Sequence, residues 1–494
     1  MSQRSAGSLA RLTGVALAAM AALVGSVSAQ GSSQAVAKRK IPLTTASAEA
    51  RKEYVKGRSL GENLRANDSR QFFERAAAKD PSFALAHYSL ALNSPTAKEF
   101  FGHLKVAVAL APKASDGERL MILGLEAGAN GDTRKQLDYF ERLVAAYPND
   151  ERAHFLLGTS YFGQQNYPKS IREYQRAIEI APDYAPAYNL LGYAQRQAGQ
   201  FGEAEKAFKK YIVLIPNDPN PYDSYAELLM KMGRFDESIA MYRKALAQAH
   251  FPASYVGIAS NLMFQGKHDA SRAEAWKLYQ AAKNDGERRA ALFASAVAYA
   301  DEGKLDQALA DLKKEYAVAE KINDAVAMSG DAVAMGDVLL EAGKPEEARS
   351  YYEKSLALQE RSDLSKEAKD DARLVHHYNL GRVALAANDV AAARQHADAF
   401  MRGATAKDNA AETRQAHELA GTIALQEKKF EQALAELTQA NQQDPYVLYR
   451  TGLAYQGKGD AAKAGEMFKQ AAHHNTLPTL NYAFVRLKAS RMKA

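Results

Sequence analysis

The residue types that carry catalysis are present in this chain, but they do not form a complete motif. Gly452 and Gly457-Lys458 have the spacing of a phosphate-binding loop, yet Gly459 stands where a serine or threonine would bind magnesium. His417-Glu418 is not followed by a second histidine four residues later, as a zinc-protease helix would require. These fragments therefore predict neither a nucleotide site nor a metalloprotease site.

Metal binding by other residues is no better supported. The paired histidines are His376-His377 and His473-His474, and adjacent residues of a helix point to different faces, so each pair would need ligands from elsewhere. The chain has no cysteine, which excludes disulfides and thiolate metal sites. We expect no catalytic residue, no metal and no cofactor, and therefore a protein that is not an enzyme.

Charge gives little indication of an electrostatic partner. The formal net charge of the 494-residue chain is +6, and the basic cluster Lys38-Arg39-Lys40 fits either a solvated run or a contact with an anionic lipid surface. No basic stripe with interleaved aromatic residues recurs, so we expect no nucleic-acid partner.

The first 29 residues have the pattern of a secretory signal peptide. Arg4 and Arg11 precede an apolar run over 12–27, and Val27-Ser28-Ala29 provides small residues for cleavage. We expect a periplasmic or secreted protein with no stable membrane insertion after cleavage. The alternative is an inner-membrane protein anchored by an uncleaved signal. Residues 30–48 are expected to form a flexible leader.

An internal repeat dominates the rest of the chain. Three segments, starting at residues 151, 185 and 219, align without gaps at a period of 34. Small residues at two places in each unit would let two antiparallel helices approach closely, and glycines such as Gly199 and Gly233 would end the first helix. The recurring residues are Gly158, Gly192 and Ala226 at position 8, Ser170, Ala204 and Ser238 at position 20, and Tyr174, Phe208 and Tyr242 at position 24.

The same pattern extends in both directions. Downstream the small residue at position 8 recurs at spacings of 40, 45, 40 and 31, which predicts longer helices or linkers there, and residues 253–286 fit poorly. We count about twelve units and expect no strand. The further position-8 residues are Gly57, Ala91, Gly124, Ala296, Gly336, Gly381, Gly421 and Gly452.

This pattern closely resembles the tetratricopeptide repeat (TPR) family. The resemblance implies an all-α fold, a right-handed α-solenoid whose stacked hairpins form a superhelix with an inner groove. We divide the chain into an N-terminal array (49–286), a C-terminal array with longer repeats (287–479) and a capping helix (480–494).

By resemblance to TPR proteins, the groove is lined by positions 2, 5, 6, 9 and 12 of each first helix. Aromatic rings there would supply contact area, and Asn and Arg would fix the register of a bound segment. The alternative is that these rings pack against neighbouring hairpins. The candidate groove residues are Tyr88, Met121, Phe155, Asn189, Tyr193, Arg196, Glu227, Phe293, Tyr378, Arg382 and Tyr449.

The leading hypothesis is a non-catalytic scaffold that binds an unidentified peptide or protein segment in this groove. Asn189 has no lysine at the matching positions of adjacent units, so the carboxylate clamp of some TPR proteins is incomplete and a chaperone tail is disfavoured. The alternatives are a structural subunit of an envelope assembly, which would use its convex surface and termini, and an enzyme with an unrecognised site.

Overall fold

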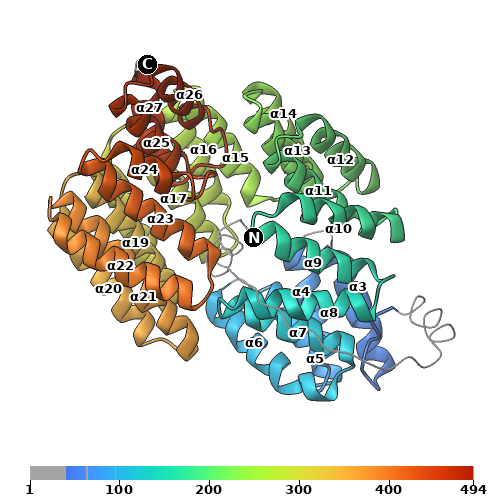
Figure 1. Ribbon diagram of the computed structural model, residues 1–494. Helices are drawn as coiled ribbons and strands as arrows, with labels where there is room; N and C mark the ends of the chain where they lie inside the picture. Colours follow the sequence, from blue (N-terminus) through green and yellow to red (C-terminus); the bar gives the residue numbers. More distant parts are fainter. Residues whose placement is uncertain (1–39, 63–64, 95, 493–494) are drawn as a thin grey trace, which may run out of the picture. The chain divides into compact units, whose positions relative to one another are not determined.

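The computed structural model describes residues 40–62, 65–94 and 96–492, and these form helical hairpins joined by short turns (Figure 1). The predicted signal peptide and residues 30–39 of the predicted leader lie outside the described residues. The described part of the chain contains no strand. Its helices form twelve hairpins, α3–α4 to α25–α26, followed by the single helix α27. The α-solenoid of about twelve units predicted from the repeat is confirmed.

Contacts divide the chain into two units, which we describe separately: unit 1 ends at Tyr225, inside α13, and unit 2 spans Ala226–Ala494. The described helices of unit 1 are α3 (Ala48–Glu62), α4 (Ala66–Lys79), α5 (Ala84–Leu92), α6 (Ala97–Leu110), α7 (Asp116–Ala129), α8 (Thr133–Ala146), α9 (Glu151–Gly163), α10 (Tyr167–Ile180), α11 (Ala185–Gln197), α12 (Phe201–Leu214) and the first part of α13 (Pro219–Lys231), with a short 3-10 helix, η2 (Ala111–Lys113), after α6.

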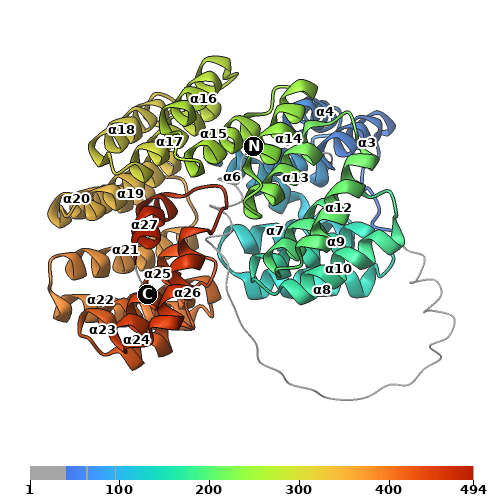
Figure 2. The same cartoon turned by 90° about the horizontal axis from the view of Figure 1, so that it is seen from above.

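Unit 2 continues the same alternation of first and second helices. Some of its helices are longer: α21 has 21 residues, whereas α9 has 13. The helices are α14 (Phe235–Gln248), α15 (Pro252–Phe264), α16 (His268–Ala281), α17 (Asp285–Asp301), α18 (Leu305–Lys321), α19 (Ala325–Glu341), α20 (Pro345–Glu360), α21 (Lys366–Ala386), α22 (Val390–Ala406), α23 (Ala410–Gln426), α24 (Phe430–Leu437), α25 (Pro445–Gly457), α26 (Ala461–Ala472) and α27 (Leu480–Arg491) (Figure 2).

Turns and caps follow from the local sequence. Gly199 and Gly233 end first helices with φ of +76° and +74°, a conformation that glycine adopts without steric strain. At the start of α7, the Ser115 side chain accepts from the Glu118 backbone N–H while the Glu118 carboxylate accepts from the Ser115 N–H, a complete capping box. Each hairpin is thus delimited by its own residues.

In six hairpins the glycine at position 8 receives an aromatic ring from the second helix of the same hairpin, whereas Gly381 and Gly421 contact Leu419 and Leu437. A Cβ atom placed on Gly192 would lie 2.7 Å from the Phe208 ring, and one on Gly158 would lie 2.7 Å from the Tyr174 ring. The ring at position 24 therefore packs within its own hairpin. The close approach predicted for these glycines is confirmed, and it needs glycine because any side chain would displace the ring. The same arrangement joins Gly57 to Phe73, Gly124 to Phe140, Gly336 to Tyr352 and Gly452 to Phe468.

No helix among the described residues combines the length and the apolar character needed to cross a membrane.

Candidate functional site

The predicted groove residues of α9 and α11 are held by contacts with their neighbours. The half-buried Phe155 ring lies 5.6 Å from the Tyr184 ring in an edge-to-face arrangement. Tyr193 packs 5.2 Å from Phe208, and the Arg196 guanidinium lies 4.8 Å from the Tyr193 ring. The structure therefore brings Tyr193 and Arg196 together and places Phe155 in a separate aromatic group.

The other predicted groove residues pack in a similar way. Asn189 is buried and donates to the side-chain oxygen of Asn220 at 3.3 Å. In unit 2, Tyr378 donates to Glu418 at 3.1 Å and Arg382 donates to Asp337 at 2.7 Å. These residues stabilise contacts between neighbouring helices, and their role in ligand binding stays a prediction. Tyr88, Met121 and Glu227 are also buried, and Phe293 and Tyr449 are half-buried.

The exposed apolar residues of the first helices were missed by sequence reasoning. Val55 on α3 is 42% exposed and Leu92 on α5 is 51% exposed. Counted from Gly57 and Ala91, they occupy positions 6 and 9, which face the inner side in TPR proteins, so the repeat numbering could have found them. Within the described first helices, no large apolar residue of unit 2 is exposed in this way.

A charged group joins the first and fourth hairpins of unit 1. Arg152, at the start of α9, lies 3.4 Å from the Glu62 carboxylate at the end of α3, and Arg58 lies 3.9 Å from the same carboxylate. Burial raises the pKa of Glu62, and the nearby charges of Arg152 and Arg58 partly offset this effect. The first helices of unit 1 therefore meet through a partly desolvated ion pair as well as through apolar contacts.

Residues 40–47, which we call the strap, follow the N-terminal ends of three first helices in unit 1. The Ile41 N–H donates to Asp150 at 2.8 Å and the Thr44 N–H donates to Glu118 at 2.7 Å. Both carboxylates also cap their own helices, Asp150 by accepting from the Arg152 N–H and Glu118 through the capping box. Within the predicted flexible leader, the strap is thus hydrogen-bonded to helix-capping carboxylates.

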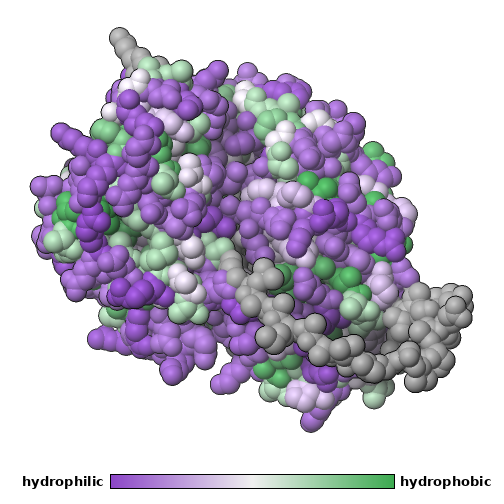
Figure 3. Space-filling view, viewed as in Figure 1, coloured by the Kyte–Doolittle hydropathy of each residue, from purple (hydrophilic) through white to green (hydrophobic). Residues whose placement is uncertain are grey.

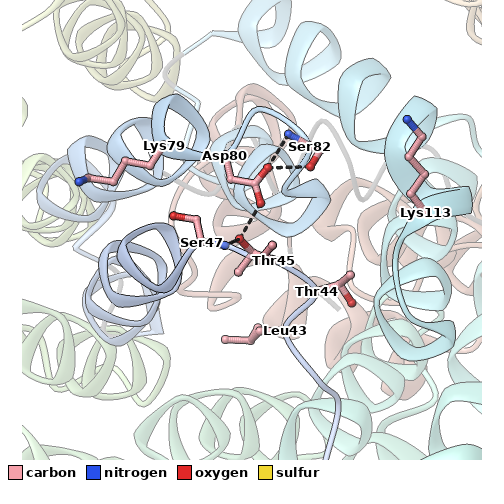
Figure 4. Close-up of a pocket in the computed structure, with 9 residues that line it drawn as sticks. Leu43, Thr44, Thr45, Ser47, Lys79, Asp80, Ser82 and Lys113 are labelled. Carbon is pink, nitrogen blue, oxygen red and sulfur yellow. Dashed lines mark hydrogen bonds between the residues drawn. The ribbon is translucent and has the colours of Figure 1, made fainter.

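The strap borders a hollow of about 620 Å³ beside the turn between α4 and α5 (Figure 4). There the Thr45 hydroxyl donates to the Asp80 carboxylate at 2.6 Å, and Asp80 also accepts from the Ser82 N–H and hydroxyl. These hydrogen bonds lower the pKa of Asp80. The hollow is lined largely by residues of the strap itself, with Lys79 and Lys113 at its sides.

In unit 2, the last helix packs against the first helices of other hairpins. α27 contacts α17, α19 and α25 as well as its neighbour α26 (Figures 1 and 2). Leu480 and Phe484 join the apolar cluster formed by residues of α15, α17, α18 and α19, among them Met263, Val297 and Met335. A capping helix was predicted here, but its contacts with α17 and α19 were not.

Ion pairs complete this contact. The Arg486 guanidinium donates to the fully buried carboxylate of Asp301 at 2.6 Å, and His268 Nε2 lies 2.8 Å from the same carboxylate. Lys488 pairs with Glu341, which also accepts from the Tyr446 hydroxyl at 3.1 Å. α27 is therefore bound to the first helices by apolar and charged groups together.

In three hairpins, histidine side chains link the first helix to the second. His154 pairs with Glu173 at 2.7 Å, and His417 pairs with Glu436 at 2.7 Å. In the α21–α22 hairpin the equivalent pair is His377 and His396, whose Nδ1 atoms lie 3.0 Å apart. Positions 4 and 23 of these units thus form a recurrent link between first and second helices. Among the described residues, His, Cys, Asp and Glu side chains do not gather in any group of three or more that could hold a metal ion.

The phosphate-loop spacing falls within a repeat. Gly452 lies inside α25, and a Cβ placed on it would contact the Phe468 ring at 2.6 Å, so this glycine serves helix packing.

Comparison with known proteins agrees with this architecture. Family models described as "Tetratricopeptide repeat" match residues 123–185, 157–219 and 333–402, residues 220–249 and residues 446–474. The chain is a tetratricopeptide repeat protein. Proteins of this family generally act as non-catalytic interaction scaffolds. No curated protein matches the chain.

Several solved structures are similar to parts of the chain. A crystal structure of MamA is 25% identical over 31% of this chain and 91% of its own, with a TM-score of 0.27. A thermophilic TPR protein from Thermus thermophilus is 24% identical over 43% of this chain and 98% of its own, with a TM-score of 0.29. A tetratricopeptide repeat protein from Parabacteroides merdae is 20% identical over 48% of this chain and 95% of its own, with a TM-score of 0.33.

Proposed function

We propose that this chain is an exported, non-catalytic scaffold that binds a protein segment on the inner face of unit 1, in the periplasm or outside the cell. The inner face is the surface formed by positions 2, 5, 6, 9 and 12 of the first helices. The observation that carries the proposal is the exposure of Val55 and Leu92, 42% and 51%, at two of these positions. Burying such side chains against a partner would be favourable, by about 25 cal/mol for each Å² of apolar surface.

The chemistry around these residues fits a peptide or helix with apolar anchors. Phe155 and Tyr193 are half-buried on neighbouring first helices, so part of each ring is accessible. Rings held by their neighbours lose little freedom on binding, which favours them as contact points. The face seen in Figure 3 is mostly hydrophilic, with apolar residues in small separate groups.

Export is supported by the sequence of the first 29 residues, and the absence of catalysis by the general role of the family. The proposals of export and of a non-catalytic role are both independent of the geometry of the inner face. Cleavage of the signal would leave a mature chain that starts ten residues before the strap, at Gln30.

The experiment compares partner capture by matched variants. Envelope extract is passed over the wild-type protein, over Val55→Asp/Leu92→Asp, and over Val213→Asp, a control that alters a valine exposed by 69% on the second helix α12. We expect the inner-face variant to lose partners that the wild type and the control retain. Identical partners for all three proteins would rule out the inner face of unit 1.

A structural subunit of an envelope assembly is the second candidate. Trp276 on the second helix α16 is 53% exposed and stacks on Tyr279 with ring centroids 4.8 Å apart. An exposed, rigid aromatic pair is typical of protein interfaces. If Trp276→Glu abolishes association of the protein with the envelope assembly while Val55→Asp/Leu92→Asp leaves that association intact, the role as a structural subunit that uses its convex surface is favoured.

A further inference from the structure

α27 lies where a ligand of unit 2 would lie. In TPR proteins the first helices face the inner groove, and α27 packs against three first helices, α17, α19 and α25. Its contacts bridge long stretches of sequence: Arg486 and Asp301 are 185 residues apart, and Lys488 and Glu341 are 147 apart. A helix that only covered the last hairpin would need contacts with α25 and α26 alone.

The contact has the chemical features of helix recognition. Leu480 and Phe484, four residues apart, enter the apolar cluster of unit 2 as the anchors of one helix face. The carboxylates of Asp301 and Glu341 receive Arg486 and Lys488 from the same helix. Charge complementarity of this kind selects partners and fixes their register. The surface is therefore complementary to an apolar helix that carries two cationic residues.

The connection of α27 permits exchange. α27 follows α26 along the chain and is joined to it through the seven residues between Ala472 and Leu480. It can therefore leave its site without breaking the chain path through α15 to α26. Lys488 is 47% exposed, so one of the two ion pairs lies at the edge of the contact and is open to competition.

We propose that the inner face of unit 2 is a binding site for an apolar helix that carries two cationic residues, and that α27 is its resident ligand. A partner helix with the same spacing of leucine, phenylalanine and cationic residues binds by replacing α27. A short tether gives α27 an effective concentration on the order of millimolar, so a free helix competes poorly until α27 is weakened. This site is separate from the inner face of unit 1, so its failure would leave the proposed function untouched.

The test uses the full-length protein and a fluorescein-labelled peptide of residues 478–492. Arg486→Glu weakens α27 and leaves Asp301 in the site, whereas Arg491→Glu makes the same change at an exposed residue of α27. We expect Arg486→Glu to bind the peptide at least tenfold more tightly than wild type, and Arg491→Glu to bind it like wild type. A peptide carrying Arg486→Glu should bind none of them. The proposal is overturned if the peptide with the native sequence binds the wild-type protein and the Arg486→Glu protein with equal affinity, or if it binds neither.

Hydrogen exchange of the wild-type protein gives a second reading that does not depend on a variant. If α27 is exchangeable, its amides should exchange at least tenfold faster than those of α17 and α25, because it opens on its own. Exchange of α27 only together with α17 and α25 would show that it is a permanent part of the core and would overturn the proposal.

Discussion

Replacing Glu412 by glutamine should stabilise unit 2 at neutral pH, and the gain should increase as the pH rises. Glu412 lies in the first turn of α23, where its residue is 1% exposed. Neither carboxylate oxygen has a hydrogen-bond partner among the described residues. Burial, and then the charge of Asp371, raises the pKa of Glu412 from 4.5 to about 8, and Lys407 offsets this only in part.

The magnitude follows from the pKa. Because the pKa of Glu412 is higher in the folded than in the unfolded chain, the protonated carboxyl contributes stability that is complete below about pH 4.5 and is lost as the pH rises through about 8. Each pH unit in this window corresponds to about 1.4 kcal/mol. At pH 7 the free energy of unfolding of the wild type is therefore about 3 kcal/mol lower than it would be with a carboxyl that stayed protonated. Glutamine does not ionise, so the Glu412→Gln variant retains this stability.

Urea unfolding followed by far-UV circular dichroism at pH 4, 7 and 8.5 measures this difference. Glu412→Gln should match the wild type within about 0.5 kcal/mol at pH 4 and exceed it by about 3 kcal/mol at pH 7. Glu347→Gln, which alters an exposed glutamate of α20, should change stability by less than about 0.5 kcal/mol throughout. If the difference in stability between Glu412→Gln and wild type is the same at every pH, the Glu412 carboxyl titrates as an ordinary glutamate and its burial does not raise its pKa.

Two further substitutions test the packing of the helices. In the same urea titration, Gly192→Val should lower the free energy of unfolding by about 2 kcal/mol or more, because its Cβ would lie 2.7 Å from the buried Phe208 ring. The control Gly202→Val, which has open space around it, should change the free energy of unfolding by less than about 0.5 kcal/mol. Asp301→Ala should destabilise unit 2 by about 3 kcal/mol, because Arg486 would lose its buried partner. Equal thermal stability of this variant and the wild type would show that the ion pair does not stabilise unit 2.

The fold could be predicted from the sequence because one local rule recurs. A small residue at position 8 and a ring sixteen residues later, as in Gly158 and Tyr174, are both visible in the sequence and are sufficient to define a hairpin. The poorly matching segment 253–286 also contains a hairpin, α15–α16, since stacking between neighbouring hairpins compensates for a weak repeat.

The candidate site could be predicted only in part. The position numbers of the TPR repeat identify which helix faces inward. They do not show that Asn189 and Tyr378 form hydrogen bonds with Asn220 and Glu418. The contact between Arg486 and Asp301 has no periodic signal, because the two residues lie 185 apart in the sequence and meet only after many hairpins have stacked. Long-range closure of this kind depends on the cumulative rotation of the repeats.

Site-specific photo-crosslinking in the native cell envelope shows whether the inner face of unit 1 binds a partner protein. A photoreactive amino acid is placed at position 55 or 92, on the inner face of unit 1, or at position 213 on the second helix α12, where the native side chain is more exposed than at either inner-face position. We expect positions 55 and 92 to crosslink to the same partner protein and position 213 not to crosslink to it. Two results would contradict binding on the inner face: adducts at position 213 alone, or no adducts at positions 55 and 92 in an envelope where the wild-type protein captures the partner.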